Sequence, residues 1–83
     1  MSKSSELVLL TREACHLCHA MAALLDAELP SYGLGYEARN VDENPVWRER
    51  FGDVVPVLLR DGTPVAKIRL DRAQLRRIIW RRR

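Results

Sequence analysis

The chain has 83 residues, of which 47% are hydrophobic and 30% charged, with four glycines and four prolines. This composition excludes a disordered or collagen-like chain, and the length excludes two domains, so we expect one globular domain over residues 1–83. Residues 69–83 hold seven arginines against a single aspartate and carry +6, whereas residues 1–68 carry −3. The net charge of +3 therefore comes from arginines that are concentrated near the carboxyl end.

The sequence also lacks the features of a secreted, membrane-spanning or disulfide-stapled protein. The apolar run 7–10 is shorter than the core of a signal peptide and far shorter than a membrane span. The chain has two cysteines, Cys15 and Cys18, which are too few and too close together to staple a secreted scaffold. We therefore expect a monomeric cytoplasmic protein that does not enter a membrane.

The first half of the chain predicts a strand followed by a long helix. The continuous apolar run Leu7–Thr11 is typical of a strand that is covered on both faces. The segment Cys15–Leu29 is rich in Ala, Leu and Met, contains no Gly or Pro, and stops before Pro30, which predicts a helix. Its apolar face carries Leu17, Cys18, Met21, Leu24, Leu25 and Leu29, and its opposite face carries Cys15, His16, His19, Ala23 and Asp26. The two cysteines are therefore expected to differ in exposure.

Three further strands are predicted over Tyr36–Val41, Val54–Leu59 and Val65–Arg69. Between the first two, Asn44 is a predicted N-cap with Pro45 at the first helical position, and this opens a short helix through Phe51. The pair Asp61-Gly62 is a strong signal for a two-residue hairpin, so the last two strands should be antiparallel neighbours.

A final helix is predicted after Asp71, which can form a capping box with Gln74. Leu75, Ile78 and Ile79 give this helix an apolar stripe. The order strand, helix, strand, helix, strand, strand, helix predicts an α/β fold of the form βαβαββα. In it a four-stranded mixed sheet is flanked by three helices.

The run Cys15-His16-Leu17-Cys18-His19 carries most of the functional information. Cys15 is expected at the amino end of a helix directly after a strand, where unpaired N–H groups and the helix dipole favour a thiolate. Cys18, three residues later, could attack a mixed disulfide formed at Cys15. The spacing therefore favours a redox pair with Cys15 as nucleophile and Cys18 as resolving thiol.

Three other interpretations of these five residues remain open at this point. Cys-x-x-Cys-His is also the pattern of covalent haem attachment, with His19 as axial ligand, but no export signal accompanies it. A structural zinc site needs four converging ligands, and every Cys and His of the chain falls within these five consecutive residues. Finally, both cysteines could be small core residues with no chemistry. We expect no metal site.

The sequence resembles the thioredoxin superfamily, and within it small glutaredoxin-like proteins of largely uncharacterised function. The resemblance rests on Cys15-His16-Leu17-Cys18 after the first strand and on Asp53-Val54-Val55-Pro56-Val57 at the third. It implies that Pro56 is cis and faces the cysteines, and that the Val55 backbone pairs with the substrate peptide or glutathione. A proline inside an otherwise good strand pattern also marks a special position on physical grounds.

Two departures from glutaredoxins bear on the substrate. The common Pro-Tyr between the cysteines is replaced by His16-Leu17, and the family's Gly-Gly and acidic pair before the last helix shrink to Leu70-Asp71. Side chains at Lys67 to Leu70 should therefore crowd the groove in which glutathione lies. We expect weak activity with glutathione as co-substrate, a preference for protein disulfides, and no tightly bound cofactor.

The remaining candidate residues each have a functional and a structural interpretation. Arg12 could add positive potential beside Cys15 and bind substrate, or be a solvated loop residue. His16 could donate to either sulfur, and His19 could stabilise the thiolate or simply be solvated. Asp71 is most simply an N-cap.

The sequence predicts a thiol-disulfide oxidoreductase whose substrate contacts come from Arg12, His16, Val55 and Pro56. Its substrate is expected to be a protein disulfide or a glutathione mixed disulfide. One alternative is a binding module that keeps the fold without the redox chemistry. Another alternative is suggested by the arginine-rich segment 76–83, which could bind an acidic partner or nucleic acid. So short a basic run is weak evidence for binding nucleic acid.

Overall fold

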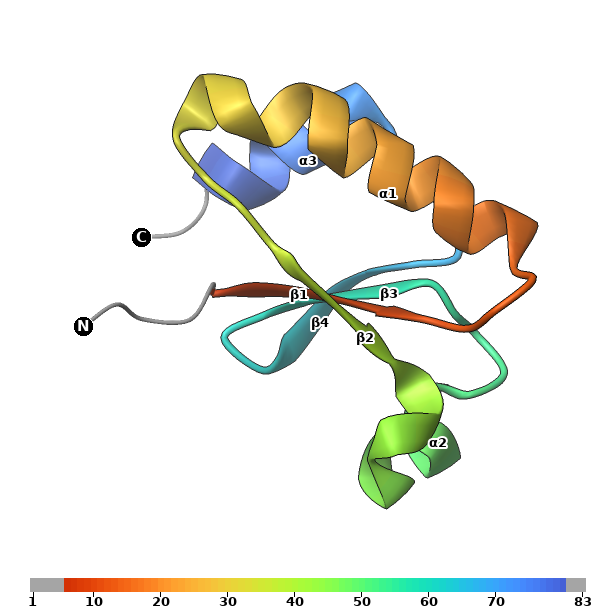
Figure 1. Cartoon of the computed structure of the whole chain (residues 1–83). Coiled ribbons are helices and arrows are strands. Elements are labelled where there is room, and N and C mark those ends of the chain that lie inside the picture. Colours follow the sequence, from red (N-terminus) through yellow and green to blue (C-terminus); the bar gives the residue numbers. More distant parts are fainter. Residues whose placement is uncertain (1–5, 81–83) are drawn as a thin grey trace.

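The computed structural model describes residues 6–80 and contains the predicted order of elements (Figure 1). The strands are β1 (Leu7–Thr11), β2 (Glu37–Asn40), β3 (Val57–Arg60) and β4 (Thr63–Lys67). The α-helices are α1 (His16–Glu28), α2 (Pro45–Phe51) and α3 (Arg72–Trp80), and two short 3-10 helices are η1 (Leu29–Tyr32) and η2 (Val41–Glu43). Within residues 6–80, no helix combines the length and the apolar character needed to cross a membrane.

The sheet is mixed, with the strand order β2-β1-β3-β4. β1 is parallel to β2 and antiparallel to β3, and β3 is antiparallel to β4. The predicted central position of β1 is confirmed, because Leu7, Leu9 and Leu10 are completely buried. The four-stranded α/β architecture expected from the order of elements is the one observed.

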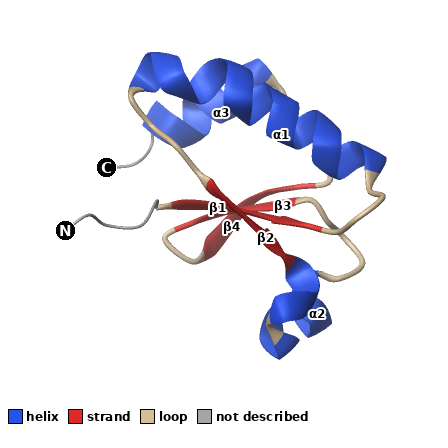
Figure 2. Cartoon of the chain, viewed as in Figure 1, coloured by secondary structure: helices blue, strands red, loops and turns tan. Residues whose placement is uncertain are grey.

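Helices cover the two faces of the sheet unequally (Figures 1 and 2). On one face, α1 and α3 pack against β1 and β3 in a core cluster that includes Leu9, Leu25, Leu58, Leu75 and Ile79. On the other face, only the short segment η2–α2 packs on the sheet, in a smaller cluster formed by Leu10, Val41, Phe51, Val57 and Leu59. Side chains therefore alternate between two cores along β1 and β3.

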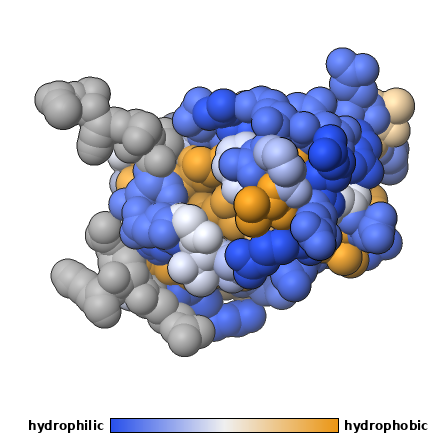
Figure 3. Space-filling model, turned by 90° about the horizontal axis from the view of Figure 1, so that it is seen from below, coloured by the Kyte–Doolittle hydropathy of each residue, from blue (hydrophilic) through white to orange (hydrophobic). Residues whose placement is uncertain are grey.

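The face on which α2 lies is less completely covered. Val8, Val54 and Val55 pack against the smaller cluster while remaining partly exposed, and Val46 on α2 is 58% exposed. Figure 3 shows hydrophobic surface in the middle of this face, ringed by hydrophilic residues. A seven-residue helix is too short to shield a four-stranded sheet.

Local signals correctly placed the hairpin turn and the starts of α2 and α3. Asn44 caps α2 by accepting hydrogen bonds from the backbone N–H groups of Val46 and Trp47, and Pro45 occupies the first turn. Asp61 and Gly62 both have positive φ, at 51° and 86°, as the tight hairpin requires. Asp71 and Gln74 form the expected reciprocal capping pair, with distances of 2.8 and 2.9 Å.

The predicted strand boundaries are wrong at three places. β2 is shorter than Tyr36–Val41, because Asn40 caps η2 and turns the chain there. β3 begins at Val57 rather than Val54, directly after Pro56, which has no N–H for a strand ladder. β4 runs over Thr63–Lys67 rather than Val65–Arg69, because an edge strand tolerates proline within it and Ile68, with a φ of 71°, ends the strand.

Two polar contacts fasten the helices to the sheet. The guanidinium of Arg60, only 10% exposed, forms an ion pair with Glu6 and donates to the carbonyl of Ile78 at 2.6 Å, near the carboxyl end of α3. The hydroxyl of Tyr36 donates to Asp26 on α1 at 2.8 Å. Burial of the ring, with this hydrogen bond, raises the pKa of Tyr36 to about 12.

We expect Arg60→Ala to lower the free energy of unfolding by about 2 kcal/mol, because it removes a largely buried ion pair with Glu6 and a charged donor at a helix carboxyl end. Urea unfolding measures the change. Arg48→Ala, an exposed arginine on α2, is the matched control and should shift the free energy by less than about 0.5 kcal/mol. Equal stabilities of the two variants would contradict the anchoring role of Arg60.

Candidate active site

The site begins where β1 ends and α1 starts. Ala14 adopts a left-handed conformation with a φ of 57°, which turns the chain sharply out of the sheet. Cys15 then takes the N-cap position of α1, so the predicted helix starts one residue later than Cys15 itself. Its Sγ accepts a hydrogen bond from the backbone N–H of Cys18 at 3.1 Å, and its carbonyl accepts one from His19 N–H at 3.1 Å. The sulfur thus lies at the positive end of the helix dipole.

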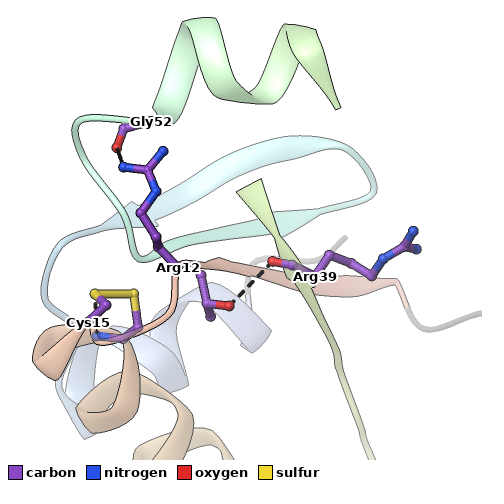
Figure 4. The surroundings of a disulfide bond; sticks show 6 residues. Arg12, Cys15, Arg39 and Gly52 are labelled. Atoms are coloured by element: carbon purple, nitrogen blue, oxygen red, sulfur yellow. Dashed lines mark hydrogen bonds between the residues drawn. A yellow bond between two sulfur atoms is a disulfide. The ribbon is translucent and has the colours of Figure 1, made fainter. Parts of the chain in front are cut away.

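Cys15 and Cys18 form a disulfide whose Cα atoms are 5.2 Å apart (Figure 4). Cys18 is 1% exposed and belongs to the buried face of α1, whereas Cys15 is half-buried. This is consistent with a Cys-x-x-Cys redox motif in which one sulfur is more accessible than the other.

The side chain of Arg12 points away from the disulfide, toward α2 (Figure 4). Its guanidinium donates to the carbonyl of Gly52 at 2.9 Å and forms an ion pair with Asp42 at 2.9 Å. Arg12 therefore ties the turn before Cys15 to the segment that leads into β3. A role for Arg12 in binding substrate stays a prediction.

Gly52 is required at this junction for steric reasons. A Cβ atom there would lie 2.5 Å from the carbonyl oxygen of Arg48 and 3.3 Å from the Arg12 guanidinium. The sequence predicted a helix that ends at Phe51, as the structure shows, but it did not indicate that Gly52 contacts Arg12, which is 40 residues away.

The segment before β3 lies at the same end of the sheet as the cysteines. Leu10 pairs with Val57 across antiparallel strands, which sets Val55 and Pro56 beside the chain that leaves β1. The Val55–Pro56 peptide bond is cis, Pro56 is buried and Val55 is half-buried. The carbonyl of Pro56 accepts a hydrogen bond from Ile68 N–H at 2.7 Å, so the loop after β4 is fixed to this segment.

The two histidines of the motif are both exposed on α1. His16 lies in the first turn, between the cysteines, and His19 lies one turn further on. Their predicted effects on the thiolate stay predictions. Across residues 6–80 no group of three or more His, Cys, Asp or Glu side chains is arranged to hold a metal ion.

The loop between β4 and α3 has a backbone conformation that the sequence did not predict. Ile68 has a φ of 71°, which is unfavourable for a β-branched residue. Local sequence propensities therefore did not predict this conformation. Its side chain is 40% exposed. Ile68, Arg69 and Leu70 line a shallow pocket of about 110 Å³ together with Leu17, Ala20 and Met21 of α1. Side chains thus occupy the segment where the resemblance to glutaredoxins leads one to expect glycines.

Comparisons with known proteins agree on fold and family. An uncharacterized protein of Mycobacterium tuberculosis, Rv0508, is 39% identical over 80 residues, covering 88% of this chain and 80% of its own. The solution structure of protein Ne2328 from Nitrosomonas europaea is similar with a TM-score of 0.75 at 28% identity, over 94% of both chains.

A more distant structure shows the same fold. Thioredoxin from Fasciola hepatica matches with a TM-score of 0.60 at 19% identity, over 93% of this chain and 79% of its own. The fold is therefore thioredoxin-like, as the sequence predicted. The sequence profile of the Glutaredoxin-like domain (DUF836) matches residues 6–79, and the chain belongs to this family.

Proposed function

We propose that the protein is a thiol-disulfide oxidoreductase that uses Cys15 and Cys18 as its redox pair. The observation that carries the proposal is the position of the Cys15 sulfur at the N-cap of α1, bonded to a buried Cys18 three residues later. Helix N-termini stabilise thiolates, and only the thiolate attacks a disulfide.

The reaction with a disulfide substrate proceeds in two exchanges. The Cys15 thiolate attacks one substrate sulfur, which forms a mixed disulfide and releases the other substrate sulfur as a thiolate. The Cys18 thiolate then attacks the Cys15 sulfur, which forms the Cys15–Cys18 disulfide and releases the second substrate thiolate. The substrate disulfide gains two electrons and becomes two thiols after protonation. The Cys15–Cys18 pair loses two electrons. A thiol reductant such as glutathione must then return the pair to its reduced form.

The burial of the two sulfurs supports this division of roles. Cys15 is half-buried and can meet a sulfur on another molecule, whereas Cys18 is 1% exposed and can reach only the neighbouring Cys15. The cis segment Val55–Pro56, at the same end of the sheet, offers backbone groups to an extended substrate, and His16 is exposed beside the cysteines.

Protein disulfides are the proposed substrates. Glutathione needs cationic and backbone donors beside the cysteines, but the Arg12 guanidinium is engaged by Gly52 and Asp42. The side chains of Ile68 and Arg69 also line the pocket at the loop before α3, where they leave less room for glutathione. We propose a monomer without tightly bound cofactor that acts in the cytoplasm, where thiol reductants are maintained.

In the reduced protein, we expect Cys15 to react with iodoacetamide faster than Cys18 at neutral pH, because it combines exposure with a helix N-terminus. Peptide mapping by mass spectrometry at successive times gives the two rates separately. Cys15→Ser and Cys18→Ser proteins provide each rate in isolation. Equal rates for the two thiols would refute the assignment of roles.

The substrate preference can be tested with two substrates and one variant. We expect the wild type to reduce insulin disulfides efficiently and a glutathione mixed disulfide weakly. Cys18→Ser should lose more than about tenfold in insulin reduction, because the mixed disulfide at Cys15 is no longer resolved. Cys15→Ser should be inactive on both substrates. If Cys18→Ser keeps glutaredoxin-like rates with the glutathione mixed disulfide, the protein uses one-thiol glutathione chemistry instead.

A further inference from the structure

Two hollows meet at Arg69 and Leu70 and lead away from the cysteines. The first is the pocket of about 110 Å³ that begins at Leu17, the residue directly before Cys18. The second, of about 260 Å³, lies between β4 and α3. Because Arg69 and Leu70 line both, the two form one surface feature, here called the β4–α3 groove.

The β4–α3 groove combines apolar side chains with unpaired positive charge. Val65, Leu70 and Ile78 contribute apolar surface to it, and Lys67, Arg69 and Arg77 contribute cations. No carboxylate lines either hollow, and no carboxylate among residues 6–80 forms an ion pair with these three cations. The neighbouring Arg72, in contrast, is paired with Glu28 at 3.0 Å. Within the described part of the chain, these three cations are therefore not neutralised by ion pairs and give the groove a positive potential.

The strand next to these charges, β4, lies at the edge of the sheet and favours an extended ligand. β4 is the last strand in the order β2-β1-β3-β4, so on its outer side it pairs with no strand of residues 6–80. Such an edge accepts an extended chain through backbone hydrogen bonds. An extended peptide with acidic side chains would match both the edge and the cations, while an apolar side chain would fit the pocket at Leu17 and Ile68.

We propose that the β4–α3 groove binds an acidic, extended segment of the protein substrate, next to the cysteine that Cys15 attacks. This inference rests on the proposed function and specifies its substrate class. The groove starts beside the redox pair, so a segment bound there would direct the adjacent disulfide toward Cys15. Small disulfides without such a segment gain nothing from it.

The test compares two peptides in wild type and in two charge-matched double variants. Both peptides contain one intramolecular disulfide, which is flanked by an apolar residue and then by three Glu in one peptide and three Gln in the other. Arg69→Gln/Arg77→Gln removes two charges from the groove. Arg48→Gln/Arg50→Gln removes two exposed charges from α2, on the opposite face of the sheet.

We expect the groove variant to lose about tenfold in kcat/KM for the Glu peptide and to keep its rate with the Gln peptide and with bis(2-hydroxyethyl) disulfide. The α2 variant should resemble the wild type. The wild-type preference for the Glu peptide should also fall as salt is raised. An equal loss in both double variants would show an effect of net charge alone and overturn the proposal.

Binding without chemistry separates this inference from the proposed function. Fluorescence anisotropy with fluorescently labelled Glu and Gln peptides, their cysteines replaced by serine, should show tighter binding of the Glu peptide to the wild type and loss of that preference in the groove variant. No preference in the wild type, or stronger binding of a single-stranded oligonucleotide through Arg69 and Arg77, would overturn the groove proposal. Failure to reduce any disulfide would instead overturn the redox function, whatever the peptides bind.

Discussion

The burial of β1 on both faces is the constraint on which the rest of the molecule depends. Leu7, Leu9 and Leu10 have no exposed surface, so β1 must pair with strands on both edges and be covered by helices above and below. The covered strand ends at Thr11, at the edge of both cores. The polar turn that follows can leave the sheet only there, and it delivers Cys15 to the start of α1. The position of the Cys15 sulfur is thus a consequence of how the core is filled.

The start of α1 has unusual capping chemistry. Its first turn holds no acidic residue, and the group that accepts the N–H of Cys18 is a sulfur rather than an oxygen. Sulfur is a weak acceptor as a thiol and a much better one as a thiolate. The helix start therefore gains most when Cys15 is ionised, which links local helix stability to the reactivity of the site. Arg12 contributes by holding the preceding turn against Gly52 and Asp42.

Features set by neighbouring residues were predictable, and features set by distant ones were not. The Asp61-Gly62 hairpin, the Asn44 cap and the buried face of α1 each follow from a few consecutive residues, and the structure has all of them. In contrast, the contact between Arg12 and Gly52 depends on the packing of α2, and the left-handed conformation of Ile68 depends on its bond to Pro56. The same loop lines the pocket next to Leu17, so the detailed shape of that pocket could not be predicted from consecutive residues.

The reduction potential of the Cys15–Cys18 pair tests the central claim most directly. It can be measured by equilibrating the protein with glutathione buffers of known ratio and quantifying the two forms by mass spectrometry after acid quenching. A pair that exchanges disulfides with substrates should lie between roughly −270 and −120 mV, where thioredoxins, glutaredoxins and oxidants of this chemistry fall. A potential below about −300 mV would instead identify a structural disulfide and contradict the redox account.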